Sequence, residues 1–121
     1  MRFASLGSGS EGNALLVQAG ATTVMIDCGF AVRQVVERCA RLGFDAASIN
    51  AIVVTHEHSD HVGGVPRLAR RFDIPVWLTF GTLAATESRW EGCTLRGFDS
   101  HDPFAVGDLE VQPFPVPHDA R

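Results

Sequence analysis

Four side chains that can bind metal ions lie within the six residues 56–61. The apolar run 51–55 in front of them predicts a short buried strand, and Gly63-Gly64 opens a new element behind them. We therefore expect the four on a loop at the C-terminal end of a strand, where α/β proteins usually carry their chemistry. Two imidazoles at alternate positions can converge on one cation, and the next carboxylate and imidazole can reach a second. The four residues are His56, His58, Asp60 and His61.

The atoms of this set favour particular metals. Imidazole nitrogen with carboxylate oxygen suits Zn²⁺, and also Mn²⁺ or Fe²⁺, whereas the lack of a thiolate argues against a closed structural zinc site. The alternative is a polar, hydrogen-bonded loop that is rich in histidine. Glu57 and Ser59 are expected to shape this loop rather than to bind metal.

The segment 55–61 with Gly63-Gly64 resembles the signature of the metallo-β-lactamase superfamily. The segments 5–13 and 25–29 resemble the first motifs of its YycJ/WalJ-like branch, which is related to the DNA- and RNA-cleaving members. The segment 117–120 resembles the third motif of that branch. The resemblance covers nearly the whole chain, and the His-x-His-x-Asp-His pattern is its most specific part.

The resemblance implies two divalent metal ions, with zinc favoured over manganese or iron. His56, His58 and His118 would bind the first, and Asp60 and His61 the second. Asp60 would also accept a proton from the attacking water. The bridging Asp and the late His that complete the pair in the superfamily have no counterpart in this sequence.

The implied activity is that of a metal-dependent hydrolase in which a metal-bound hydroxide attacks the substrate. The phosphodiesterase and nuclease members are the nearer match, so nucleic acid or another phosphodiester is the expected substrate. Two alternatives stay open. One is a thioester or lactam hydrolase of the same superfamily, and the other is an inactive metal-binding fragment.

Other residues are candidates for supporting roles. Asp27, within Ile-Asp-Cys-Gly, is either a turn-forming Asp ahead of Gly29 or an acceptor that fixes the tautomer of a ligand histidine. Arg67, Arg70 and Arg71 form either a solvated helix face or contacts to substrate phosphates. Ser10 and Asn13 lie in a glycine-rich loop and are candidate contacts at the metal cleft.

Composition limits the alternatives. The net charge is −4 and all ten basic residues are arginine, so any site for a polyanion must be local. Three cysteines without CxxC spacing are poor material for a disulfide framework and favour the reducing cytoplasm. No apolar run approaches the roughly 20 residues of a membrane span, and no signal peptide is apparent, so no membrane partner is expected.

The element pattern predicts strands followed by strand-helix alternation. Strands are expected at 2–6, 13–19, 22–27, 51–55, 75–79, 94–98 and 109–116, and helices at 32–42, 65–72 and 81–88. This order predicts an α/β (α+β) fold with one mixed sheet and helices on its outer face. By resemblance, residues 1–121 would form the N-terminal half of an αββα sandwich domain, cut after the third metal motif. Such a fragment would leave one sheet face bare and is expected to self-associate.

Overall fold

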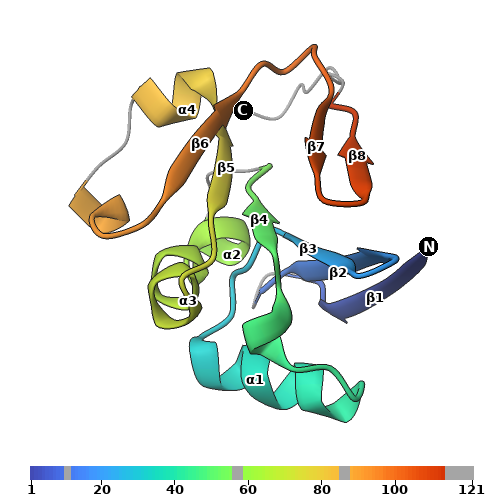
Figure 1. The fold of residues 1–121 in the computed structure, drawn as a ribbon. Helices are drawn as coiled ribbons and strands as arrows, with labels where there is room; N and C mark the ends of the chain where they lie inside the picture. The colour runs from blue at the N-terminus through green and yellow to red at the C-terminus, as the bar shows by residue number, and fades with distance from the viewer. Residues whose placement is uncertain (10–11, 56–58, 85–87, 114–121) are drawn as a thin grey trace.

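A six-stranded mixed sheet forms the centre of the molecule (Figure 1). The computed structural model describes residues 1–9, 12–55, 59–84 and 88–113, without the side chains of Ser59 and Asp60. The strand order is β1-β2-β3-β4-β5-β6; the first three strands pair in antiparallel and the last four in parallel. The strands are β1 (Arg2–Gly7), β2 (Ala14–Ala19), β3 (Thr22–Ile26), β4 (Ala51–Val53), β5 (Val76–Thr79) and β6 (Leu95–Phe98). The predicted mixed sheet is confirmed.

Helices connect the parallel strands. Gly43 follows Leu42, the C-cap of the first long helix, with φ 73°, as expected for the glycine after a helix. Pro66 lies in the first turn of the second long helix. The helix predicted at 81–88 is confirmed in part, because a five-residue helix directly follows β5. The helices are α1 (Val32–Arg41), α2 (Ser59–Val62), α3 (Val65–Phe72) and α4 (Phe80–Ala84), with 3₁₀ turns η1 (Ala46–Ser48) and η2 (Ser88–Trp90).

The two faces of the sheet bury different partners. Figure 1 shows α1 and α3 on one side of the sheet and a hairpin of β7 (Phe104–Val106) and β8 (Leu109–Val111) on the other. On β3, Met25 faces the helices while Val24 faces the hairpin, and both are almost fully buried. Burial on both faces explains why these strands read as continuous apolar runs rather than as alternating patterns.

The hairpin corrects two expectations. The strand predicted at 109–116 begins as expected but is only three residues long within the described residues, and it pairs with β7, which the sequence reading missed. The ring of Phe104 stacks on Trp77 of β5 at 4.4 Å and on Phe98 of β6 at 4.7 Å between centroids. The prediction of a bare second face is therefore wrong over β5 and β6, because the hairpin covers it.

None of the helices in the described residues is long and apolar enough to cross a membrane. All three cysteines are free thiols, and Cys28 and Cys39 are buried in the core on the helix side of the sheet.

Candidate metal centre

The three residues after β3 tie together the loops that carry the predicted site. Successive backbone N–H groups of residues 27–29 donate to the carbonyls of Val53, His61 and Asn13, at 2.8, 2.6 and 3.0 Å. These acceptors lie at the end of β4, in α2 and in the loop between β1 and β2. The end of β4, α2 and the loop at Asn13 are therefore fixed to one short stretch of backbone at the C-terminal end of β3.

Asp27 is the buried charged group at this junction. Its side chain is 6% exposed, and its backbone has φ 61°, in the left-handed region that a residue with a side chain rarely adopts. The carboxylate accepts a hydrogen bond from the backbone N–H of Thr55 at 2.7 Å and another from the Thr55 hydroxyl. Bonds to a charged acceptor are stronger than neutral ones, so they can hold a strained conformation in place.

The same carboxylate contacts His61. Oδ2 of Asp27 lies 2.9 Å from Nδ1 of His61, whose side chain is 23% exposed. Because a carboxylate only accepts hydrogen bonds, Nδ1 carries the proton, and a neutral ring then has its lone pair on Nε2. A histidine held in this way by a carboxylate is the usual form of a metal ligand. The residues that the structure describes here thus fit a bound cation, with His61 in the tautomer that coordinates through Nε2.

The other predicted ligands cannot be placed. His56, His58 and His118 lie outside the described residues, and Asp60 is described only as backbone within α2. Among the side chains that the structure does describe, no three His, Cys, Asp or Glu gather in a group that could hold a metal ion. The ligand set therefore stays a prediction, and the position of His61 beside Asp27 is its structural anchor.

Gly64 fixes the geometry behind the metal loop. A Cβ at this position would overlap the backbone carbonyl of Phe30, and the Gly64 N–H donates to the carbonyl of Cys28 at 2.9 Å. Only glycine allows this close approach of the two chains. The start of α3 is thereby held against the segment that follows β3.

The three candidate arginines have different surroundings. Arg67 is exposed and lines a cavity of about 390 Å³ together with residues 29–32 and 63–64, next to the predicted metal loop. Arg70 donates to the carbonyls of Arg89 and Glu91 at 3.0 and 2.9 Å, which fastens the turn at η2 to α3. The guanidinium of Arg71 lies 4.9 Å from the ring centroid of Phe72. Of the three, Arg67 is the one whose position suits contact with a ligand.

The loop between β1 and β2 approaches the same junction. Oδ1 of Asn13 accepts from the Gly9 N–H at 3.1 Å, and its Nδ2 donates to the Gly9 carbonyl at 2.9 Å. Asn13 thus closes the loop, while Ser10 lies outside the described residues. β2 begins at Ala14 and runs antiparallel to β1, which leaves no room for the crossover helix of a dinucleotide-binding unit.

Sequence reasoning assigned no role to Thr55. The parallel register pairs Ile26 with Val53, so the residues that follow these two strands lie side by side. Thr55 lies two positions after Val53, the last residue of β4, which is the parallel neighbour of β3. A polar residue at this place is the signal that could have identified Thr55 as a donor to Asp27. Burial raises the pKa of the Cys28 thiol to about 11, and its Sγ donates to the carbonyl of Phe30 at 3.5 Å.

Comparison with known proteins places these features in context. Residues 7–120 match the family described as the metallo-beta-lactamase superfamily. The exodeoxyribonuclease YycJ of Bacillus anthracis is 33% identical over 99% of this chain and 47% of its own length. The ribonuclease TTHA0252 of Thermus thermophilus is 37% identical over 72% of this chain and 21% of its own. A B3 metallo-beta-lactamase with an active-site glutamic acid aligns with TM-score 0.72 and 22% identity, over 91% of this chain and 47% of its own.

Proposed function

The chain belongs to the metallo-beta-lactamase superfamily, and from this premise we propose that it contributes to a metal-dependent hydrolase that cleaves nucleic acid phosphodiesters. The observation that carries the proposal is the hydrogen bond between Asp27 and His61, which prepares a histidine of the predicted metal motif for coordination. The two bonds from Thr55 to the same carboxylate hold the loop in place, so the bond to His61 is the contact that bears on metal binding.

Phosphodiesters are favoured as substrates over thioesters and lactams. The relative that aligns with almost all of this chain is called an exodeoxyribonuclease, and the second is called a ribonuclease. The lactamase structure is only 22% identical, so it supports the fold and says nothing of the substrate.

The residues have separate proposed roles. His56, His58 and His118 would hold the first cation, and Asp60 and His61 the second. When bound, such a cation pair supplies an activated water and offsets the charge that develops on the phosphate oxygens. Asp27 orients His61 through Nδ1, and Asp60 accepts a proton from the attacking water. Arg67, beside the loop, is proposed to contact a substrate phosphate.

The chain spans about half the length of the curated exodeoxyribonucleases that align with nearly all of it. We therefore propose residues 1–121 as the N-terminal part of one domain of this kind, and the activity as a property of the whole domain. We also propose zinc as the metal and the cytoplasm as the location of the protein.

The test is a hydrolysis assay with single-stranded DNA, single-stranded RNA, a thioester and a β-lactam, each with Zn²⁺, Mn²⁺ or EDTA. It uses the 121-residue chain and, where the gene reads on past Arg121, the complete reading frame. We expect phosphodiester cleavage that needs metal, and we expect its rate to fall at least about 100-fold in Asp60→Ala. Asp102→Ala removes an exposed carboxylate elsewhere and should leave the rate unchanged.

Two outcomes would overturn the proposal. Robust thioester or lactam cleavage without phosphodiester cleavage would replace the substrate class. A complete reading frame that binds metal and cleaves nothing would leave only a metal-binding protein.

A further inference from the structure

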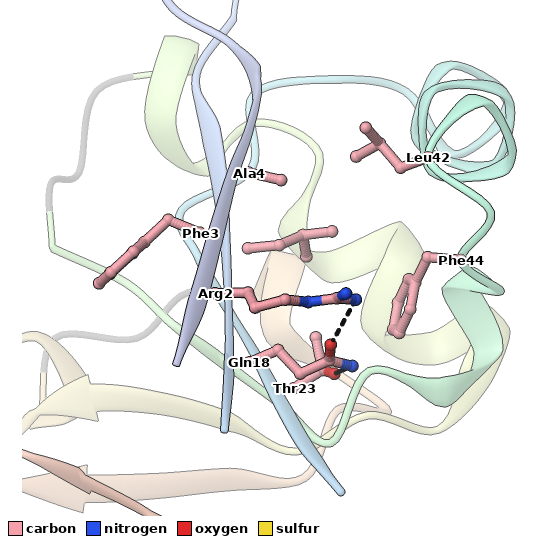
Figure 2. A pocket seen from close by; sticks show the side chains of 8 residues that line it. Arg2, Phe3, Ala4, Gln18, Thr23, Leu42 and Phe44 are labelled. Atoms are coloured by element: carbon pink, nitrogen blue, oxygen red, sulfur yellow. Dashed lines mark hydrogen bonds between the residues drawn. The ribbon is translucent and has the colours of Figure 1, made fainter. Parts of the chain in front are cut away.

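A second cavity lies far from the predicted metal loop, between the first strands of the sheet and the segment after α1 (Figure 2). It has a volume of about 260 Å³. Thr23, at the start of β3, is one of its lining residues, whereas Asp27 follows the other end of that strand. Four residues of strand separate the two by roughly 13 Å along the sheet. Nothing in the proposed hydrolase chemistry uses this cavity.

Most of the cavity wall is apolar. Leu16 is buried, Phe44 is half-buried, and Leu42 is 53% exposed at the end of α1. Figure 2 shows Leu42 and Phe44 opposite Ala4 of β1, while the ring of Phe3 points away on the other side of the strand. These side chains leave an apolar hollow that is open to solvent at one end.

A row of hydrogen bonds runs along one side of this hollow. Nη2 of Arg2 donates to Oε1 of Gln18 at 2.9 Å, and Nε2 of Gln18 donates to Oγ1 of Thr23 at 3.0 Å. Thr23 is itself fixed, because its N–H donates to Oδ1 of Asn50 at 2.7 Å. The second bond orients the Gln18 amide with its oxygen toward Arg2, so the guanidinium is held over the cavity (Figure 2).

Among the residues that the structure describes, Arg2 is the one charged residue that lines the cavity. In the described part of the chain no carboxylate lies within ion-pair distance of Arg2, and its bond to Gln18 uses one of five guanidinium N–H groups. A guanidinium prefers a carboxylate that accepts two parallel hydrogen bonds. The charge of Arg2 and the apolar side chains beside it therefore complement a molecule with an anionic head and an apolar body.

We propose that this cavity binds a small monocarboxylate that carries one aromatic ring or one branched alkyl group. The carboxylate bonds to Arg2, and the apolar group packs against Leu42 and Phe44. The size sets the class, because pockets for drug-sized ligands occupy about 300–1,000 Å³ and this one is smaller. This inference does not depend on the proposed nuclease activity.

The test is an NMR titration of the ¹⁵N-labelled protein with phenylacetate and, separately, with phenylacetamide. The amide has the same shape without the charge. Phenylacetate should shift the backbone signals of Ala4, Leu42 and Phe44 and should bind at least about tenfold more tightly than phenylacetamide. This comparison is made on the unaltered protein and so needs no variant to fold.

Two variants sharpen the test. Arg2→Gln should weaken phenylacetate binding about tenfold and leave phenylacetamide unaffected. Arg33→Gln, which removes an exposed arginine on α1 outside the cavity, is the matched control and should change neither. Ala4→Leu fills part of the hollow and should weaken both ligands. Equal affinity for acid and amide, an unchanged Kd in Arg2→Gln, or no saturable binding at about 10 mM would each overturn the proposal.

Discussion

Oδ2 of Asp27 lies 2.9 Å from Nδ1 of His61, which follows it 34 residues later in the chain. The contact joins the end of β3 to α2, and backbone bonds on either side of it hold both partners in place. The carboxylate is buried and the backbone of Asp27 is strained, and both features cost free energy of folding. They persist only because the surrounding contacts hold the residue in place. We read it as the residue around which the predicted metal loop is built.

Replacement of Asp27 should therefore destabilise the fold. In Asp27→Asn the amide group faces donors, so at least one N–H or O–H of Thr55 or His61 loses its acceptor. We expect the free energy of unfolding to fall by about 2–4 kcal/mol in urea denaturation. Asp73→Asn is the matched control, because Asp73 also has a positive φ of 56° but is exposed. It should change stability by no more than about 0.5 kcal/mol, and equal losses in both variants would refute the role of Asp27.

A methyl group at Gly64 should be equally disruptive for a different reason. Gly64→Ala forces the chain away from the Phe30 carbonyl, and we expect a loss of about 2–3 kcal/mol or more in the free energy of unfolding. Gly81 lies in α4 with no atom closer than 4.0 Å to the added Cβ. Gly81→Ala should thus be neutral or stabilising, by up to about 1 kcal/mol. A Gly64→Ala protein as stable as Gly81→Ala would contradict the close approach seen here.

Most of the fold could be predicted from the sequence because its strands and long helices have strong local patterns. The apolar runs at 22–26 and 51–53 and the helical spacing of Val35 and Cys39 led directly to β3, β4 and α1. The start of β8 was predicted within 109–116, but β7 was missed because its three residues, Phe104–Val106, are too few for a periodic signal. The Gly107-Asp108 pair between them was the available clue, since such a pair favours a two-residue hairpin turn.

The site was less predictable than the fold. The motif 56–61 pointed to metal chemistry through residue types alone, and Asp27 was recognised as a candidate acceptor for a histidine. Its actual partners, Thr55 and His61, follow from the parallel register of β3 and β4, which no local pattern specifies. Arg70 was expected either on a solvated helix face or as a phosphate contact, and neither expectation includes its bonds to two carbonyls of the η2 turn, which depend on tertiary packing.

The hairpin should contribute measurably to stability through Phe104. Phe104→Ala removes a ring that stacks on both Trp77 and Phe98, and we expect a loss of about 2–4 kcal/mol in the free energy of unfolding. The fluorescence of Trp77 should also move to longer wavelength as water reaches it. Phe80→Ala is the control, because Phe80 is 58% exposed. If the Phe80 variant lost as much stability as the Phe104 variant, the packing of the hairpin on the sheet would be in doubt.

The three thiols should differ in reactivity. Burial raises the pKa of Cys39 and of Cys93, opposed at Cys93 by the guanidinium of Arg70, so the reactive thiolate is scarce at both. Cys93 is nevertheless part-exposed, whereas Cys28 and Cys39 are fully buried. A disulfide reagent at pH 8 should label one thiol per chain, faster as the pH rises, and the other two only on unfolding. Cys93→Ser should abolish the early phase, and three equally fast thiols would contradict the described core.

Metal content tests the central claim most directly. The purified chain is dialysed against Zn²⁺ and then against metal-free buffer, and zinc per chain is measured by mass spectrometry. The unaltered chain should retain zinc, and His56→Ala/His58→Ala should lose it, because two of its proposed ligands are gone. His101→Ala removes an exposed histidine whose N–H bonds to Asp99 in a turn, and it should retain the full amount. Equal zinc in the double variant and in the unaltered chain would contradict the metal centre proposed here.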